Sequence, residues 1–236
     1  MNRQRRRVNP KNCLNLPVRP STKAPRPLPS LFAGSRWLIQ RGALLLLVFL
    51  SGCVSLEKSY PDRRYFALEL APGKTPNSTS DRILSVASLR ISPRYADRSF
   101  VYRTSTAAYE ADFYNQFLTA PDSMIAEELR KGLAASELFK YVVGPANPLQ
   151  PHYVLEGSIN ALYGDFRDPS RPAAVVEIEF FLYNQDAGAS GVSLQKRYEK
   201  SVPLSEKSPE ALIKGWDQGL ADIVAALLAD LKAANL

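Results

Sequence analysis

Alternation of apolar and polar residues predicts a β-rich chain beyond residue 65. The clearest segments are residues 153–163 and 173–184, which are long and rich in β-branched and aromatic side chains. In the second segment apolar side chains take every other position on one face, and Glu177 and Glu179 fall on the other. Residues 192–202 form a third such segment, so the three together predict an antiparallel meander.

Shorter β-rich runs precede this meander. We expect strands at residues 65–70, 83–91, 99–104, 107–114 and 139–143. Residues 71–81 are rich in Pro, Gly, Ser, Thr and Asn and predict a loop, whereas Ser105 and Thr106 predict a hairpin turn. The predicted order is therefore four strands, a helix, four strands and a closing helix.

Two helices are predicted from apolar positions that recur every three or four residues. The first covers residues 121–135, with Pro121 in its first turn. The second covers residues 208–234, where Ser208 is the expected N-cap and Pro209 the first helical residue. Its apolar stripe comprises Leu212, Trp216, Leu220, Ile223, Leu227 and Leu231. We favour a core helix over a surface for a partner helix or lipid, because most amphipathic helices bury their own stripe.

A short apolar segment near the N-terminus ends at a cysteine. Residues 42–50 are apolar, and Arg36 and Arg41 flank them. The lipobox that follows comprises Leu50, Ser51, Gly52 and Cys53. A basic segment, a short apolar segment and small residues before a cysteine are typical of a bacterial lipoprotein signal. Cys53 would then receive a diacylglyceryl group and become the first residue of the mature protein.

The length of the apolar segment disfavours two other interpretations. Its nine residues make about 14 Å of helix, whereas the hydrocarbon layer of a bilayer is about 30 Å thick. Extending the segment back to Trp37 places Arg41 in the middle, which is costly in lipid. A buried core helix fits the length, but a glycine at one end and Ser-Gly-Cys at the other fit a signal sequence better.

Cleavage before Cys53 predicts three parts: a leader at residues 1–52, the acylated cysteine and a tether at 53–64, and a single globular domain at 65–236. The tether reaches at most about 36 Å, so the domain must lie close to the membrane face. Val54 rather than aspartate follows the cysteine, which by the sorting pattern of enterobacterial lipoproteins indicates the outer membrane. The leader is long, and one hypothesis is that translation begins near Leu31.

Charge divides at the same point. The whole chain has a formal net charge of +7, but residues 1–52 hold ten basic and no acidic side chains, which leaves −3 for the remainder. The basic leader therefore gives no reason to expect a nucleic-acid partner. Cys13 and Cys53 are the only cysteines, so no thiol remains for a disulfide after processing and acylation.

Catalytic motifs are scarce. His152 is the only histidine, and no Gly-x-Ser-x-Gly elbow accompanies it. One histidine and an acylated cysteine cannot build a zinc site, and no phosphate-binding glycine pattern is present. Glu177 and Glu179 lie two apart on one strand face, where a solvated surface explains them better than a glycosidase pair. We therefore expect no enzyme activity, no metal and no cofactor beyond the covalent lipid on Cys53.

Tyrosine, phenylalanine and arginine gather between residues 94 and 114. Nucleic-acid stacking is one use of such a mixture, but the expected envelope compartment argues against it. Core tyrosines whose hydroxyl groups reach solvent are the simplest interpretation. A protein–protein contact surface is the functional interpretation, because tyrosine and arginine dominate binding hot spots.

An ordered set of segments follows the lipobox. They are Tyr65-Phe66-Ala67-Leu68, the Pro-x-Tyr-x-Asp-Arg stretch at Pro93, Tyr95, Asp97 and Arg98, the run Val101-Tyr102-Arg103, the positions Tyr109, Glu110, Phe113 and Leu129, and the strand end at residues 162–166. Together they resemble the ABC-type transport auxiliary lipoproteins, which include the paraquat-inducible protein C-like lipoproteins. The resemblance covers roughly residues 53–234. With the element order, it predicts an α/β (α+β-like) fold: a mixed, largely antiparallel sheet with two main packed helices, preceded by a lipoprotein signal peptide.

The resemblance implies a non-enzymatic role. Such lipoproteins assist ABC transporters whose MCE-domain proteins move lipids between the inner and outer membranes. The implied partners are an MCE-domain protein, bound by protein–protein docking, and the membrane, held through palmitate-type acyl chains on Cys53; a homo-oligomer is compatible with this role. The candidate partner-contact residues, which alternatively form a structurally fixed motif, are Pro93, Tyr95, Asp97, Arg98, Tyr102 and Arg103.

Two other functions stay open at this point. An envelope lipoprotein that activates or scaffolds a cell-wall enzyme is the alternative to the transport role. A hydrolase with an unrecognised site is the third, and the lone histidine argues against it.

Overall fold

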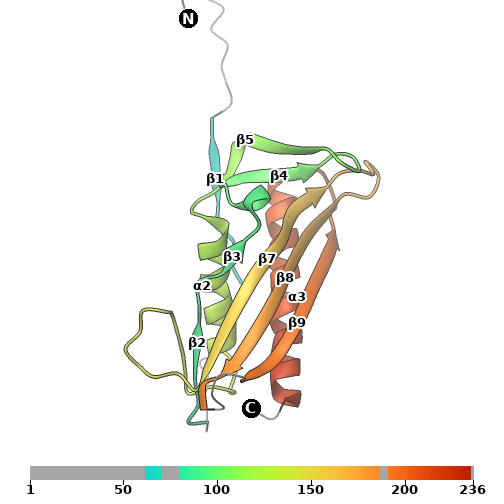
Figure 1. Ribbon diagram of the computed structural model, residues 1–236. Helices are drawn as coiled ribbons and strands as arrows, with labels where there is room; N and C mark the ends of the chain where they lie inside the picture. Colours follow the sequence, from blue (N-terminus) through green and yellow to red (C-terminus); the bar gives the residue numbers. More distant parts are fainter. Residues whose placement is uncertain (1–61, 71–79, 187–190, 235–236) are drawn as a thin grey trace, which may run out of the picture. The chain divides into compact units, whose positions relative to one another are not determined.

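The computed structural model describes residues 62–70, 80–186 and 191–234 (Figure 1). These residues belong to a compact unit that runs from Ser59 to Leu236. The lipobox with Cys53, the leader and most of the predicted tether lie outside the described residues.

Nine strands and two α-helices make up the described part of the chain. The strands are β1 (Arg64–Phe66), β2 (Ile83–Val86), β3 (Arg90–Ile91), β4 (Ser99–Arg103), β5 (Tyr109–Phe117), β6 (Tyr141–Val143), β7 (Tyr153–Asp165), β8 (Ala173–Asn184) and β9 (Val192–Pro203). The helices are α2 (Pro121–Ala134) and α3 (Pro209–Ala233), and the 3-10 helix η1 covers Pro93–Tyr95. The predicted α/β fold with a mixed sheet and two main helices is confirmed.

The sheet is built around β7. The long strands β7, β8 and β9 form the predicted antiparallel meander, and they lie side by side across Figure 1. On its other edge β7 pairs in parallel with the short strands β2, β3 and β4. β5 returns antiparallel to β4, and β1 then adds in parallel to β5. The longest pairings are thus antiparallel. The parallel pairings are short, because β2, β3 and β4 each pair with a different part of β7.

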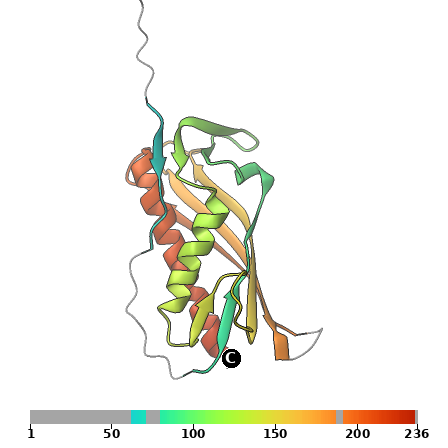
Figure 2. The ribbon, with the colours of Figure 1, turned by 90° about the vertical axis from the view of Figure 1, so that its left-hand side faces the viewer.

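Both helices cover the same face of the sheet, as Figure 2 shows. The stripe of α3 faces the core, because each of its six predicted residues is at most 2 % exposed. Trp216 lies in the middle of this stripe, and its indole Nε1 donates to the backbone oxygen of Val175 on β8 at 3.2 Å. The core interpretation of this helix is therefore confirmed. None of the described helices combines the length and the apolar character that crossing a membrane requires.

Two glycines bring α3 close to β8. A Cβ atom at Gly215 would lie 2.6 Å from Ala174 Cβ, and one at Gly219 would lie 2.9 Å from Val176 Cγ1. Real Cβ atoms do not approach that closely, so a side chain at either position would force the helix or the facing side chains of β8 to shift. The helix begins where the sequence predicts, since Ser208 Oγ accepts from the backbone N–H of Ala211 at 3.1 Å.

The single strand expected at residues 83–91 is wrong. β2 pairs Val86 with Leu155, whereas β3 pairs Arg90 with Ser158. The three residues 87–89 therefore lie opposite only the two residues 156–157 of β7. The extra residue allows Leu89 to fold over Gly157, where an added Cβ would lie 2.7 Å from Leu89 Cδ2. The strand is thus divided by a register shift that depends on a glycine in β7.

The first strand is also shorter than expected, ending at Phe66 instead of residue 70. Beyond it the backbone N–H of Glu69 donates to Asp217 Oδ1 on α3 at 2.9 Å. The next N–H, of Leu70, donates to Glu128 Oε2 on α2 at 2.8 Å. Helix carboxylates therefore replace a neighbouring strand as hydrogen-bond partners, and this segment is irregular.

Candidate functional site

Three separate segments meet at the end of β7. β4 pairs in parallel with β7 at Tyr102–Gly164 and Arg103–Asp165. The chain leaving β3 forms η1, which begins at Pro93 and presents Tyr95 to the same strand end. β5 starts opposite Arg103, because the register pairs that residue with Tyr109. The topology thus brings one arginine-rich loop and two strand ends to one place.

Tyrosines form the base of this place. Tyr95 is only 3 % exposed and stacks on Tyr163, with ring centroids 6.0 Å apart and planes at 19°. Tyr109 meets the same Tyr163 ring edge-on, at 5.9 Å and 84°. Burial raises the pKa of Tyr95, so its phenol stays protonated over the physiological range. The three rings form a fixed aromatic platform.

Two arginines lie over this platform. The guanidinium carbon of Arg94 is 4.8 Å from the centroid of Tyr109, and that of Arg103 is 5.6 Å from the same ring. Arg103 also lies 6.0 Å from the ring of Tyr163 and donates from Nη2 to the Thr106 oxygen at 3.0 Å. Its Nε is buried without a hydrogen-bond partner among the described residues. We call these five residues the Arg–Tyr cluster: Arg94, Tyr95, Arg103, Tyr109 and Tyr163.

The loop between β7 and β8 borders the cluster. Phe166 stacks on Tyr102 at 5.1 Å and 20°, and Lys207 Nζ lies 5.2 Å from the Phe166 ring. Further along, Asp168 accepts from Ser170 and from Arg171 Nε, the latter at 2.7 Å. These contacts shape a groove of about 650 Å³ between this loop and the end of β9. The lining residues Asp165, Arg167, Asp168, Arg171, Ser201 and Leu204 make its wall partly charged.

The carboxylates in this region are held ionised by their partners. Arg167 donates to Asp165 at 2.6 Å, and this contact lowers the pKa of Asp165 below its ordinary value although burial opposes the shift. Hydrogen bonds from Ser170 and Arg171 lower the pKa of Asp168 to about 2. Within this set the cations Arg94, Arg103, Arg167, Arg171 and Lys207 outnumber the two carboxylates. The surface therefore favours a partner with acidic and apolar groups.

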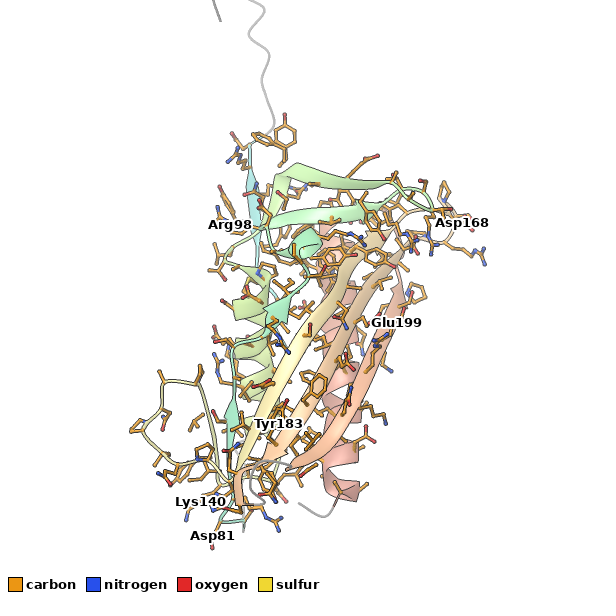
Figure 3. The ribbon with its side chains drawn as sticks, viewed as in Figure 1. Asp81, Arg98, Lys140, Asp168, Tyr183 and Glu199 are labelled. Atoms are coloured by element: carbon orange, nitrogen blue, oxygen red, sulfur yellow. The ribbon has the colours of Figure 1, made fainter. Side chains whose placement is uncertain are left out.

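The structure divides the six candidate contact residues between two places. Tyr95 and Arg103 belong to the Arg–Tyr cluster, and Pro93 lies exposed at the start of η1 beside it. Arg98 points elsewhere, donating to the Leu118 oxygen at 3.2 Å, and Figure 3 places it on the opposite side of this end of the domain from Asp168. Asp97 is exposed and accepts from the backbone N–H of Ser99 at 3.3 Å.

Tyr102 has an internal hydrogen bond. Its hydroxyl donates to Asp112 Oδ2 at 2.7 Å, and burial together with this carboxylate raises the pKa of the phenol far above its ordinary value. Tyr102 thus has a structural role at this hydroxyl, and only its ring, which stacks on Phe166, borders the candidate surface.

The residues weighed for catalysis have local partners. His152 Nδ1 accepts from the backbone N–H of Ile83 at 3.1 Å, and the backbone N–H of His152 donates to the backbone oxygen of Ile83 at 3.0 Å. Arg197 on β9 lies 3.4 Å from Glu177 and 3.9 Å from Glu179, and these two carboxylates alternate along β8 with the buried Val176 and Ile178. Among residues 62–70, 80–186 and 191–234 no group of three or more His, Cys, Asp or Glu is placed to hold a metal ion.

Sequence reasoning missed two parts of the surface. Tyr163 was expected only as the end of a strand, and residues 164–169 only as the loop that joins this strand to the next. A signal existed in the loop, where two Asp residues each have an arginine two or three positions later. Tyr163 gave no such signal, since its role depends on three segments meeting in space.

Comparisons with known proteins agree with this architecture. The sequence pattern of the ABC-type transport auxiliary lipoprotein component matches residues 66–227. A crystal structure of a protein from Xanthomonas campestris has a TM-score of 0.60 at 15 % identity, covering 70 % of this chain and 92 % of that one. A crystal structure of an uncharacterised protein has a TM-score of 0.59 at 19 % identity, covering 72 % and 99 %. A search of curated protein sequences found no significant match.

Proposed function

The chain belongs to the ABC-type transport auxiliary lipoprotein family, and from this premise we propose that it is a membrane-anchored docking protein of an MCE-type ABC transport system. In this role it holds an MCE-domain protein near a membrane while that system moves lipids between the inner and outer membranes. Acyl chains on Cys53 provide the attachment, and the outer membrane is the proposed site. The role is positional and involves no catalysis.

The Arg–Tyr cluster carries the docking part of this proposal. Arg94 is exposed and lies over Tyr109, so a cation and an aromatic face are presented together. Arg103 adds a second guanidinium group, whose carbon lies 5.6 Å from the same Tyr109 ring. Preformed arginine and tyrosine groups of this kind lose little side-chain entropy on binding, which is typical of interface hot spots.

The anchor has its own support in the lipobox. Each buried methylene of an acyl chain contributes about 0.8 kcal/mol, so two or three chains make attachment effectively permanent. Labelling cells with an alkyne-tagged fatty acid tests this directly: the chain should carry the label, and Cys53→Ser should abolish it. An unlabelled chain recovered from the soluble fraction would contradict the anchor.

Charge reversal tests the docking surface. The affinity of the MCE-domain protein for the purified acylated chain should fall about tenfold or more in Arg94→Glu, as expected for a hot-spot arginine. Lys140→Glu is the matched control, because Lys140 is exposed and lies at the far end of the domain in Figure 3. Equal affinity of the two variants would place the docking surface elsewhere.

The alternative function remains a scaffold for a cell-wall enzyme. This alternative requires the same kind of docking surface as the transport role. The identity of the captured partner therefore decides between the two functions. Recovery of a peptidoglycan synthase and no MCE-domain protein would favour the alternative.

A further inference from the structure

A large bulge interrupts the pairing of β4 with β5. Ser99 pairs with Gln116 and Val101 with Ala111, so one residue of β4 faces the four residues 112–115 of β5. The Asp112 carboxylate closes this bulge: Oδ1 accepts from the backbone N–H groups of Tyr114 and Asn115 at 2.8 and 3.0 Å. Its Oδ2 accepts from Asn115 Nδ2 and from the Tyr102 hydroxyl, each at 2.7 Å. The bulge is therefore a defined feature and not a frayed strand.

This bulge holds an aromatic side chain out of the protein. Phe113 is 58 % exposed, and its ring is met edge-on by Tyr114 at 5.2 Å. The guanidinium carbon of Arg63 lies 4.0 Å from the Phe113 centroid. Phe113 is thus held by its backbone in an exposed position, where it indicates a contact surface if further apolar side chains lie beside it.

Two further apolar side chains extend this surface across β1. Tyr65 is 49 % exposed and Leu118 is 55 % exposed. Arg98 connects them, since its guanidinium carbon is 5.8 Å from the Tyr65 ring and its Nη1 donates to the Leu118 oxygen. Arg63 and Arg98 have no ion-pair partner among the described residues. We call this surface the bulge patch, and it comprises Arg63, Tyr65, Arg98, Phe113, Tyr114 and Leu118.

The position of the patch along the chain identifies its occupant. Arg63 follows Cys53 by ten residues, a distance of at most about 36 Å even when fully extended. Acyl chains on Cys53 therefore hold the patch within that distance of the lipid surface. Its chemistry fits the same environment: aromatic rings settle at the headgroup level, and arginine extends its guanidinium towards phosphate while its stem contacts apolar groups.

We propose that the bulge patch inserts into the lipid headgroup layer of the membrane that carries Cys53. This proposal rests on the anchor under Proposed function and adds a second contact to it. A single flexible tether leaves the domain free to rotate, whereas a tether together with a seated patch fixes its orientation. The Arg–Tyr cluster then faces one direction relative to the membrane, which favours docking by reducing the freedom lost on binding.

Fluorescence quenching tests the insertion. The full acylated chain, with Phe113→Trp, is reconstituted into vesicles of phosphatidylethanolamine and phosphatidylglycerol that carry bromine on their acyl chains. A side chain seated about 5–10 Å deep reaches the upper acyl region, so the added tryptophan should lose about half or more of its emission. The buried Trp216 gives a constant background, because it is 1 % exposed in the core.

Tyr141→Trp is the matched control. Tyr141 is 50 % exposed, close to the value for Phe113, and it follows Lys140 at the opposite end of the domain in Figure 3. Its tryptophan should lose little emission in the same vesicles. Tyr65→Trp is a second reporter within the patch, for use should Phe113→Trp fail to fold, and it should be quenched like Phe113→Trp.

The outcomes separate this proposal from the anchor. If the chain floats with the vesicles but the patch tryptophans are quenched no more than Tyr141→Trp, the insertion is wrong and the anchor stands. If the chain does not float with vesicles, both are wrong. Protection of Phe113→Trp from acrylamide only after an MCE-domain protein is added would assign the patch to a protein partner and overturn the proposal.

Discussion

The Tyr102 hydroxyl donates a hydrogen bond of 2.7 Å to Asp112, and this bond joins the edge of the Arg–Tyr cluster to the bulge of β5. The Tyr102 ring stacks on Phe166 beside the Arg–Tyr cluster, while the Asp112 carboxylate organises the bulge that presents Phe113. A tyrosine that was a candidate contact residue thus connects the proposed docking surface to the proposed membrane-facing one.

Removal of the Asp112 carboxylate should destabilise the domain. Asp112→Ala leaves the partly buried Tyr102 hydroxyl and two backbone N–H groups without their acceptor, at a cost of about 2 kcal/mol. Chemical denaturation measures the change. Glu110→Ala, at an exposed neighbouring position, is the control and should change stability little. Equal stability of the two variants would mean that the bulge is not held by this carboxylate.

The lowered pKa of the Asp112 carboxylate predicts that the domain loses stability in acid. Burial would raise the pKa of Asp112, but hydrogen bonds from Asn115, Tyr102 and the backbone outweigh it and lower the pKa below the ordinary value of 3.8. The stabilisation is therefore present above about pH 4 and is lost as the pH falls through the lower folded pKa. Asp112→Asn should weaken this part of the acid dependence.

Asp217 should give the opposite pH dependence of folding stability to Asp112. Burial raises its pKa to about 6, with contributions from the carboxylates of Glu69 and Glu128, although the Glu69 N–H opposes the shift. The folded protein binds this proton more tightly than the unfolded chain, so stability falls as the pH rises from about 4 to 6. Asp217→Asn keeps an oxygen acceptor and should stabilise the domain at pH 7 by about 1 kcal/mol, a value reduced for solvent screening because the group is only partly buried.

Thermal or chemical unfolding at two pH values checks this prediction. The difference between Asp217→Asn and the parent should be clear at pH 7 and absent below about pH 4, where both forms are uncharged. A variant that is less stable at both pH values would show that the charged carboxylate is needed to hold Glu69.

Close packing of α3 on β8 gives a further prediction. Gly215→Ala places a Cβ 2.6 Å from Ala174 Cβ and should cost about 1–2 kcal/mol, because overpacking outweighs the better helix propensity of alanine. Gly144→Ala is the matched control, since nothing lies within 4 Å of its added Cβ. Denaturation midpoints compare them, and a neutral Gly215→Ala would show that the helix can move away from the sheet at no cost.

Substitution of His152 tests whether this residue has a structural or a catalytic role. His152→Ala removes the acceptor for the Ile83 N–H and should lower stability by about 1 kcal/mol without changing partner capture. Binding to the MCE-domain protein and unfolding are measured on the same preparation. A variant that folds and binds its partner but loses function in cells would revive the hydrolase interpretation.

Regular patterns predicted the scaffold well. The spacing of Leu212, Trp216 and Leu220 identified a helix whose stripe is buried, and the alternation around Glu177 and Glu179 identified a strand with one solvated face. Both signals depend on the helix or strand period alone, which the sequence contains in full.

The surface could not be predicted in the same way. Tyr95 resembled a contact residue, but it is buried because Tyr163, far along the chain, stacks on it. The division of β2 from β3 depends on Gly157 in another strand, and the bulge at Asp112 depends on the register between β4 and β5. Each of these features is a relation between distant segments, for which local periodicity carries no signal.

Photocrosslinking in cells tests the docking claim most directly. A photoreactive residue is placed at position 94 of the full acylated chain, over the Tyr109 ring, and at position 140 as the control. The account predicts that position 94 captures an MCE-domain protein and that position 140 does not. Capture of a cell-wall synthase at position 94, or capture of the MCE-domain protein only at position 140, would contradict it.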